Sequence, residues 1–523
     1  MKTRSLTALA LVVAALAAPA GPAMAAELKL AIATDVTSMD PQYANIAGNV
    51  QVSRHMFESL ADLDADGRLV PRLAESWRRV DANVWEFKLR RNVRFHDGST
   101  LSADDVVYAL GRPATLTASP ATLNGFLKDI SKAEAVDANT VRFTTSTPLA
   151  VLPNYLAMVP IVSKKVTQGL KPEDFETGKG MVGTGPYRFV KFLRSDRIEM
   201  TRNDGYWGAK PAFEKVTIRI MPNNPARTAA LLSGEVDAIA AVPAADLARI
   251  RQNQNFTFYS KPLARHTFWT LNQASDLLPT ATDHSDKALT ANPFKDVRVR
   301  RAFSKAIDRE AIGSRVMEGL GVPTQNPVPS TMFGYNPDLA PEKLDVDGAK
   351  KLMAEAGYPN CFKFSIFARS DSHPTDSAQA QAVGQMLSRL GCKVNVEVVP
   401  TSVFFTRGNK LELPMLLLAT GVDGGDLGVT LEYLFSNPTN NPFRKVNMQT
   451  YDSPAFWKPL REALAINDEQ VRERKYRDTT RVLRDEVGVI PTELMVGTWA
   501  SRKGVVLKPR VDERTYAFEA TGN

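Results

Sequence analysis

The clearest pattern of hydrophobic and polar positions lies between residues 361 and 399. Apolar side chains alternate with polar ones after residue 361 and again after residue 393, as they do in half-buried strands. Between these stretches, apolar side chains recur at the i, i+3, i+4 and i+7 spacing of one helix face, at Val383, Met386, Leu387 and Leu390. This order predicts a strand–helix–strand unit whose two strands are parallel neighbours in one sheet.

The two cysteines of the chain, Cys361 and Cys392, each stand just before one of these predicted strands. Because parallel neighbours of this kind begin level with each other, we expect the two residues to form a disulfide. A bridge that closes a loop of about 32 residues stabilises a fold by about 3 to 4 kcal/mol in the chain-entropy model. The alternative is two free thiols.

Other segments continue the alternation of strands and helices. An apolar strand is predicted over residues 413–419. A helix is predicted after Asp296, and its apolar face consists of Val299, Ala302, Phe303, Ala306 and Ile307. No low-complexity segment or short repeat interrupts the order, which is typical of an α/β fold.

The first 25 residues have the pattern of a secretory signal peptide. Lys2 and Arg4 precede an uncharged, mostly apolar run over residues 6–18, and Ala23-Met24-Ala25 supplies the small side chains that signal peptidase requires. We therefore expect cleavage near Ala25 and export to the periplasm. The apolar run is too short for a comfortable transmembrane anchor, and no other stretch reaches about 18 apolar residues.

Length and charge narrow the class of protein. A chain of 523 residues is too long for one hydrophobic core and predicts two or three domains. The formal net charge is +8, but no block of Lys and Arg is interleaved with aromatic residues, so nucleic-acid binding is not expected.

The sequence lacks the common motifs for catalysis and metal binding. The five histidines are scattered without metal-ligand spacing, and neither a nucleophile elbow nor a nucleotide-binding glycine pattern occurs. The glycine-rich turn at residues 183–186 contains Pro186, which lacks the backbone N–H that a phosphate loop would use. We predict no catalytic residues, no metal site and no cofactor.

Six short motifs follow one another along the chain. They are LAESW (residues 73–77), GTGPY (183–187), NDGYWG (203–208), LSGEVD (232–237), DVRVRRAF (296–303) and EAGYP (355–359). In this order they resemble the bacterial extracellular solute-binding protein family 5, the group of dipeptide, oligopeptide and nickel receptors.

The resemblance implies a two-lobed periplasmic binding protein with a third, smaller inserted domain, all linked by a hinge. It places the first lobe at residues 26–58, 178–268 and 497–523, the inserted domain at 59–177 and the second lobe at 269–496. The two segments that cross between the lobes are expected near residues 268–272 and 495–499.

The candidate ligand site is predicted from the ends of strands. In an open α/β sheet, ligands bind beyond the carboxyl ends of the strands. Arg369 follows the first predicted strand of the unit, and Asp423 follows the strand at residues 413–419. This pair suits a zwitterion, because a guanidinium holds a carboxylate and a carboxylate holds an ammonium. The alternative is that both are solvated loop charges.

The resemblance implies roles for these two residues. Asp423 matches the residue that pairs with the α-ammonium of a peptide in peptide-binding members of the family. Arg369 matches, by its position relative to Asp423, the arginine that holds the carboxylate in the dipeptide-binding branch. Thr420 and Gly421 belong to the same segment, in which Thr420 stands where the family has Trp. That difference changes a wall of the expected pocket.

Two further ligand candidates are Phe404 and Asn272. Phe404 matches an aromatic position near the cleft, with a plain core phenylalanine as the alternative. Asn272 follows a crossing strand, where its side chain could bind backbone at the hinge instead of ligand.

The expected function is that of a monomeric periplasmic receptor of an ABC importer, which traps a small peptide between its lobes and delivers it to membrane permease subunits. A receptor for another solute, such as a nickel chelate, an opine or an oligosaccharide, is the alternative within this class. A periplasmic hydrolase or chaperone is the alternative from another class, which the missing motifs disfavour.

Overall fold

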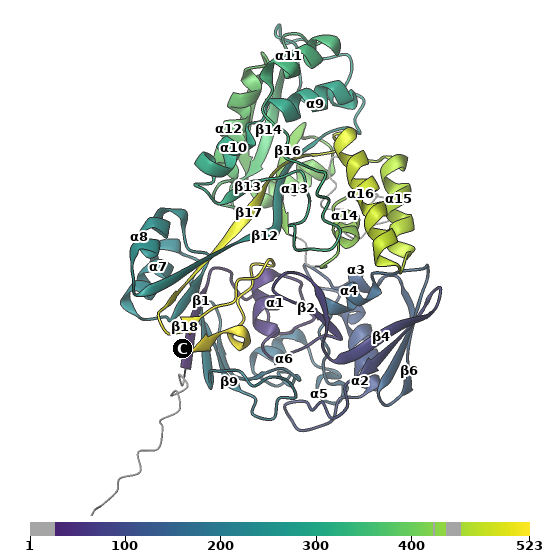
Figure 1. Cartoon of the computed structure of the whole chain (residues 1–523), viewed down its shortest axis with the longest axis vertical. Coiled ribbons are helices and arrows are strands. Elements are labelled where there is room, and N and C mark those ends of the chain that lie inside the picture. Colours follow the sequence, from purple (N-terminus) through teal and green to yellow (C-terminus); the bar gives the residue numbers. More distant parts are fainter. Residues whose placement is uncertain (1–26, 422–423, 436–450, 523) are drawn as a thin grey trace, which may run out of the picture.

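A long mixed β-sheet runs through the middle of the molecule (Figure 1), which is described by a computed structural model over residues 27–421, 424–435 and 451–522. Ten of its strands form a continuous path and an eleventh pairs to one side. In spatial order the strands are β15 (Lys393–Val399), β14 (Lys363–Arg369), β16 (Met415–Gly421), β12 (Phe256–Leu271), β17 (Ile490–Arg502), β11 (Ala238–Ala240), β1 (Glu27–Ile32), β10 (Lys215–Ile220), β9 (Arg197–Arg202) and β8 (Tyr187–Leu193), with β13 (Gly321–Pro323) paired to β17.

A second, antiparallel sheet lies at the right of Figure 1 and consists of β4 (Ala74–Asp81), β5 (Val84–Leu89), β7 (Thr140–Thr145) and β6 (Ile130–Asp137). Two short hairpin-like pairs complete the strands: β2 (Ala61–Leu63) with β3 (Leu69–Pro71), and β18 (Val505–Val506) with β19 (Thr521–Gly522).

The helices surround these sheets. They are α1 (Ala47–Ser53), α2 (Ala103–Gly111), α3 (Asn124–Leu127), α4 (Leu152–Ala157), α5 (Lys164–Thr167), α6 (Pro172–Glu176), α7 (Asn224–Ser233), α8 (Leu247–Gln252), α9 (Val297–Ala306), α10 (Arg309–Ala311), α11 (Val346–Glu355), α12 (Asp376–Ser388), α13 (Thr401–Asn409), α14 (Leu427–Phe435), α15 (Pro454–Ala465) and α16 (Glu469–Asp485). Within the described ranges, none of them is long and apolar enough to cross a bilayer.

The local predictions for the second half of the chain are confirmed. β14 and β15 pair in parallel with Lys363 opposite Lys393, and α12 connects them. All five residues of the apolar face predicted for the helix after Asp296 are fully buried, four of them in α9 and Ile307 directly after it. Together with the mixed sheet, these elements confirm the α/β class.

Strands β12 and β17 carry the chain between the upper and lower parts of Figure 1. They pair antiparallel, with a register irregularity between Pro262 and His266. Pro262 has no backbone N–H for the ladder, which favours a break at this point. A second irregularity lies between Thr267 and Phe268, at the edge of the crossing predicted near residues 268–272, where β12 pairs with both β16 and β17.

The motifs of the first half of the chain converge on the carboxylate of Glu58, which is 2% exposed. It accepts hydrogen bonds from Thr184 Oγ1 at 2.9 Å, Tyr206 Oη at 2.8 Å and Trp207 Nε1 at 2.9 Å. Arg72 Nε forms an ion pair with it at 2.7 Å. The GTGPY and NDGYWG motifs therefore hold the fold together around one buried charge.

Gly183 shows why this turn requires glycine. Its backbone passes so close to Met56 that a Cβ atom on Gly183 would lie 1.9 Å from the Met56 carbonyl oxygen. Gly185 N–H donates to the same oxygen at 2.9 Å. The turn is therefore a packing element of the fold.

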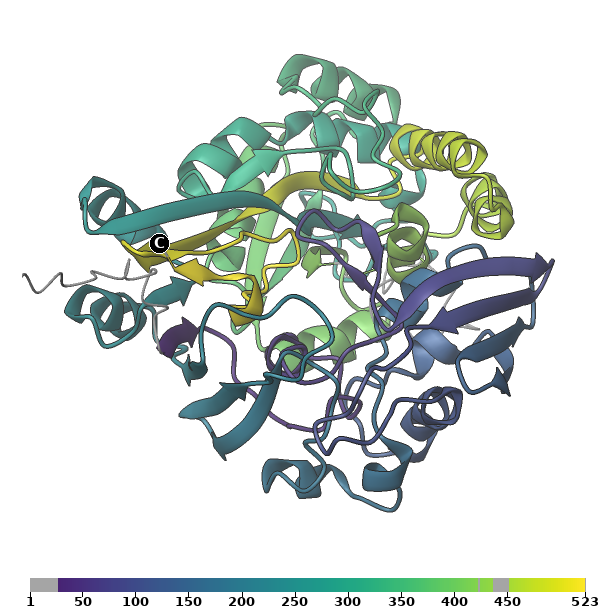
Figure 2. The same cartoon turned by 60° about the horizontal axis from the view of Figure 1, so that its bottom comes forward.

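The second, antiparallel sheet packs beside α15 and α16, as the two views of Figures 1 and 2 both show. Arg79 Nη1 donates to the Ala465 carbonyl oxygen at 2.9 Å, and the Ala150 N–H donates to the Leu464 carbonyl oxygen at 2.6 Å. Segments far apart in the sequence thus meet on this side of the molecule.

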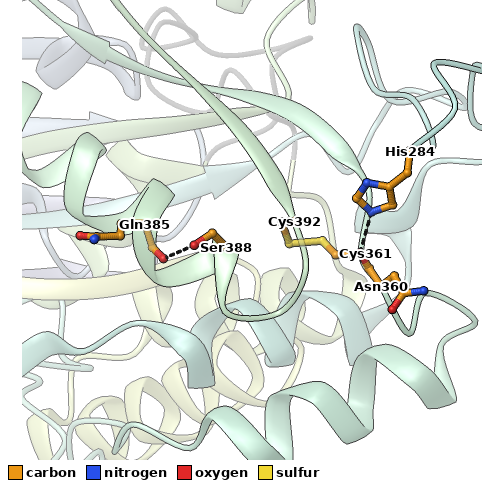
Figure 3. Close-up of a disulfide and its surroundings, with 6 residues drawn as sticks. All are labelled: His284, Asn360, Cys361, Gln385, Ser388 and Cys392. Atoms are coloured by element: carbon orange, nitrogen blue, oxygen red, sulfur yellow. Dashed lines mark hydrogen bonds between the residues drawn. A yellow bond between two sulfur atoms is a disulfide. The ribbon is translucent and has the colours of Figure 1, made fainter.

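Cys361 and Cys392 form a disulfide in the structure, with their Cα atoms 4.8 Å apart (Figure 3). The bridge joins the starts of β14 and β15. A loop that precedes α9 packs against it, because His284 Nε2 donates to the Asn360 carbonyl oxygen at 2.8 Å. The same loop pairs with β14 through backbone hydrogen bonds between Thr282 and Lys363.

We expect the exported protein to contain no titratable thiol when it is denatured without reductant. Replacing both Cys361 and Cys392 by serine should lower the free energy of unfolding by about 3 to 4 kcal/mol, since the unfolded chain regains a loop of about 32 residues. Thiol titration and urea unfolding measure the two effects. Two reactive thiols in the wild-type protein would contradict the pairing.

Candidate functional site

A cavity of about 1070 Å³ lies where segments from all over the chain meet. One wall comes mainly from segments that precede β12, including residues between 119 and 126, and the other mainly from segments that follow it. Strands β12 and β17 and residues 512–514 also line the cavity. The volume lies at the upper end of the range of small-molecule pockets, about 300 to 1000 Å³.

The wall that comes from the part of the chain after β12 is formed by strand ends, as the sequence predicts for a ligand site. Thr420 and Gly421, at the carboxyl end of β16, line the cavity. The loop that follows β14 lines it with residues 372–375. β14 and β16 are parallel, so both of these segments leave the same edge of the sheet.

The opposite wall repeats this arrangement. Residues 32–34 at the carboxyl end of β1 and residues 240–244 at and after the end of β11 line the cavity, and these two strands are also parallel. The cavity thus lies between the carboxyl ends of two sets of parallel strands. This is the position at which open α/β sheets bind ligands.

Several charged side chains line the cavity in pairs. Arg265, in β12, forms an ion pair with Glu513. Asp512 is bound by Arg510 at 3.0 Å and by Arg514 at 3.4 Å. Burial raises the pKa of Asp512, but these two arginines outweigh burial and hold it at about 2. Asp512 is therefore a fixed negative charge with its partners already in place.

Arg227, in α7, is a buried structural cation at the edge of the cavity. Its guanidinium donates to the carbonyl oxygens of Ala240 at 3.0 Å, Met221 at 2.7 Å and Ala241 at 2.6 Å. Burial lowers its pKa. These bonds shape the turn after β11, which forms part of the cavity wall.

His373 is a neutral side chain in the opposite wall. Burial, followed by the charges of Arg265 and Arg369, lowers its pKa to about 4. Its Nδ1 lies 3.0 Å from Thr375 Oγ1. At pH 7 the imidazole therefore offers one donor and one acceptor but no charge.

Arg369, the last residue of β14, is not among the residues that line the cavity. Its guanidinium lies 5.8 and 5.9 Å from the ring centroids of Phe404 and Phe405. Burial lowers its pKa, and Asp376, whose carboxylate is 3.9 Å away, opposes that effect. Its Nε and Nη2 atoms are buried without a hydrogen-bond partner in the described ranges.

The other predicted candidates lie in different places. Phe404, in α13, is fully buried and packs on Phe405. Asn272 is also fully buried, and its side chain donates to the Leu411 carbonyl oxygen at 2.9 Å and accepts from the Ser275 N–H at 3.0 Å. Neither lines the cavity. Asp423 lies outside the described residues.

Sequence reasoning missed most of the ionisable residues of the cavity, including Arg265, His373 and Glu513. Arg265 and Glu513 are separated by 248 residues in sequence and meet only because β12 and the C-terminal segment pack together. No local motif marks either of them. His373 stands in the loop after β14 and could have been found by extending the strand-end argument beyond Arg369.

The described residues contain no cluster of three His, Cys, Asp or Glu side chains that could hold a metal ion. The cavity offers paired charges, hydroxyls and backbone groups, together with apolar contacts from Phe126 and Trp499. Such a mixture suits a polar organic ligand with charges of both signs.

Three comparisons with known proteins bear on this site. A family model described as bacterial extracellular solute-binding proteins, family 5, middle, matches residues 68–442. The chain is 30% identical over 471 residues to the glutathione-binding protein GsiB of Pectobacterium atrosepticum, across 88% of this chain and 87% of that protein.

Solved structures agree with the fold. HbpA2 of Haemophilus parasuis is 26% identical and superposes with a TM-score of 0.81, over 95% of this chain and 100% of the other. The periplasmic binding protein DppA of Helicobacter pylori, solved with the peptide STSA, is 24% identical, with a TM-score of 0.76 over 95% and 98% of the two chains. The similarities extend over nearly the whole chain and include both walls of the cavity.

Proposed function

Because the chain belongs to the bacterial extracellular solute-binding proteins of family 5, the receptors of ABC importers, we propose that it binds small peptides in the cavity described above and delivers them to a membrane permease. The proposal includes release of the ligand unchanged, with no catalytic step. We further propose that the protein acts as a monomer in the periplasm after cleavage near Ala25.

The observation that carries the proposal is the position and make-up of the cavity. Two sets of parallel strands point their carboxyl ends at it, and it is lined by charges of both signs. A peptide has charged ends of opposite sign and a polar backbone between them, so it matches such a lining.

Within this proposal, Asp423 takes the α-ammonium of the peptide. The support is the resemblance of its segment to that of peptide-binding members, together with the position of Gly421 and Gly424, both of which line the cavity. Arg369 has a less direct position, because it does not line the cavity and its guanidinium lies 3.9 Å from the carboxylate of Asp376. For Arg369 to hold a carboxylate of the ligand, its side chain would have to reach the cavity.

Glutathione is the second candidate ligand. A relative that is 30% identical over most of its length is named for binding it. Glutathione is itself a small peptide with charges of both signs, so it belongs to the same chemical class as the ligands proposed above. Nickel chelates, opines and oligosaccharides are less well matched to the paired charges of the cavity.

The domain division proposed from the sequence is supported by the second sheet. Residues 59–177 contain all four strands β4 to β7, which form a sheet of their own. We propose that the remaining parts are two lobes, and that they hinge where β12 and β17 lose register between Pro262 and His266.

The direct test is to purify the protein natively, identify bound molecules by mass spectrometry, and measure the affinity of the candidates by calorimetry. A peptide or glutathione that binds should also raise stability, by about 2.7 kcal/mol at 100 times its Kd. Saturable binding without turnover supports a receptor. Hydrolysis of the bound peptide, or binding only of sugars or metal chelates, would overturn the proposal.

We also expect the ligand to make the protein more compact. The inserted domain and the second lobe already touch: Lys128 Nζ lies 3.0 Å from Glu432 Oε1, Tyr155 Oη donates to the same carboxylate, and Asn154 Nδ2 donates to the Gly424 carbonyl oxygen at 2.8 Å. These contacts belong to a closed state that the ligand should favour.

Solution scattering measures this closure as a decrease in radius of gyration on saturation. The Tyr155→Phe substitution removes one hydrogen bond between the domains, worth about 1 kcal/mol, and should shift the equilibrium towards the open state about fivefold. Tyr335→Phe is the control, since the Tyr335 hydroxyl makes no hydrogen bond within the described part of the chain. An unchanged radius on saturation with a confirmed ligand contradicts the hinge.

A further inference from the structure

Three residues that line the cavity have left-handed backbones although they are not glycine. They are Ala241, Glu318 and Glu513, with φ angles of 56°, 52° and 65°. A side chain is disfavoured in this region because its Cβ atom approaches the carbonyl oxygen. Such positions cluster at ligand sites, where the surrounding structure enforces them. Two of the three carry a carboxylate.

Glu318 stands at the tip of a turn that is held tightly in place. The turn follows the π-helix Ile312–Val316, and three of its residues, Met317, Glu318 and Leu320, line the cavity. Gly319 N–H donates to the Gly313 carbonyl oxygen at 3.0 Å, and Val496 N–H donates to the Leu320 carbonyl oxygen at 2.9 Å. The second bond ties the turn to the long strand β17.

The base of this turn is packed without spare room. A Cβ atom on Gly313 would lie 2.7 Å from the Gly321 carbonyl oxygen and 2.9 Å from Oε2 of the buried Glu493. The turn therefore has little freedom to relax, which explains how it keeps Glu318 in an unfavourable backbone conformation. Single-turn π-helices of this kind are frequent at functional sites.

Glu318 differs from the other two carboxylates that line the cavity, because both of those are already paired with arginines. Asp512 is bound by Arg510 and Arg514, and Glu513 is paired with Arg265. Glu318 is exposed, and no ion pair or hydrogen bond to its side chain exists within the ranges that the structure describes. Its charge is therefore still available to a molecule in the cavity.

We propose that Glu318 determines ligand specificity by accepting a cationic group of the ligand, a side-chain ammonium or guanidinium, at a subsite separate from the strand ends. The inference rests on the proposed function, since it concerns which peptides the same cavity selects. An ion pair gains strength when the ligand displaces water from the cleft. The turn also holds the backbone of Glu318 beside the cavity before any ligand binds, so less conformational freedom is lost on binding than from a mobile loop, which also favours the pair.

Calorimetry with two matched peptides tests the inference. Ala-Lys-Ala and its analogue with norleucine in place of lysine differ by one ammonium group at nearly equal length. The wild-type protein should bind the lysine peptide about tenfold more tightly than the analogue, and this ratio should shrink as salt is added. In Glu318→Gln the ratio should fall to about one.

Two further variants separate charge from structure. Glu318→Gly also lacks the carboxylate but relaxes the left-handed backbone, so it should melt no lower than the wild type and should still lose the preference. Glu310→Gln replaces an exposed residue of α10 outside the cavity and should keep the preference for the lysine peptide. A wild-type protein that binds both peptides equally, or a preference that survives in Glu318→Gln, overturns the role of Glu318 while the peptide function stands. If neither peptide binds, the inference fails, and the native purification and calorimetry described above decide separately whether the peptide function fails as well.

Discussion

Replacing Glu58 by glutamine is expected to lower the free energy of unfolding by about 3 to 5 kcal/mol. The carboxylate of Glu58 accepts hydrogen bonds from three side chains and pairs with Arg72, all in a site that is 2% exposed. An amide offers one acceptor oxygen in place of two. It leaves the Arg72 guanidinium with only the more distant carboxylate of Asp62, at 4.0 Å, and turns an NH₂ group towards groups that donate.

Urea unfolding, followed by fluorescence of the tryptophans, measures this loss. Glu75→Gln is the matched control, because Glu75 is exposed on β4 and should change stability by less than about 0.5 kcal/mol. The ligand affinity of the folded fraction should stay close to that of the wild type, since Glu58 does not line the cavity. A loss below about 1 kcal/mol would show that the network is not an important source of stability.

The second large effect concerns Asp423. If the peptide is held by its amino terminus, Asp423→Asn should weaken binding by about 2 to 5 kcal/mol, roughly 30- to several-thousand-fold, because the substitution leaves a desolvated ammonium without its partner. An N-acetylated peptide should bind the wild type weakly and should be indifferent to the substitution. Calorimetry on both peptides gives the comparison.

Two control variants separate this effect from others. Asp347→Asn removes an exposed carboxylate in α11 and should leave affinity unchanged. Asp426→Asn should act on stability instead, because Asp426 is buried and accepts hydrogen bonds from Gly428 N and Tyr476 Oη, both at 2.7 Å. Wild-type affinity in Asp423→Asn would refute recognition of the amino terminus and would make a solute other than a peptide the better candidate.

The sequence predicted where one wall of the cavity lies but few of the residues that line it. The rule that ligands bind at the carboxyl ends of strands led to Thr420 and Gly421, both of which line it. The same rule led to Arg369, but Arg369 packs near the Phe404 ring and does not line the cavity, whereas His373 in the loop after β14 does. A rule about strand ends specifies where a backbone points and does not specify how the following loop folds.

The sequence by itself determined the elements whose cause is local. The parallel strand–helix–strand unit, the buried face of α9 and the pairing of Cys361 with Cys392 all follow from side chains within about 40 residues of one another. Periodicity reports which face of an element is buried, and that information is contained in each segment.

Tertiary structure alone decided which charges meet. Arg265 and Glu513, Lys128 and Glu432, and Glu58 and its three hydrogen-bond donors are joined across 126 to 304 residues of sequence. Their meeting depends on how β12 and β17 cross and on how the inserted domain packs against α14, which no local pattern encodes. The same packing holds the turn at Glu318 against β17. The feature behind the proposed specificity therefore exists only in the folded molecule: a carboxylate on a turn whose backbone is fixed, with no partner in the described chain.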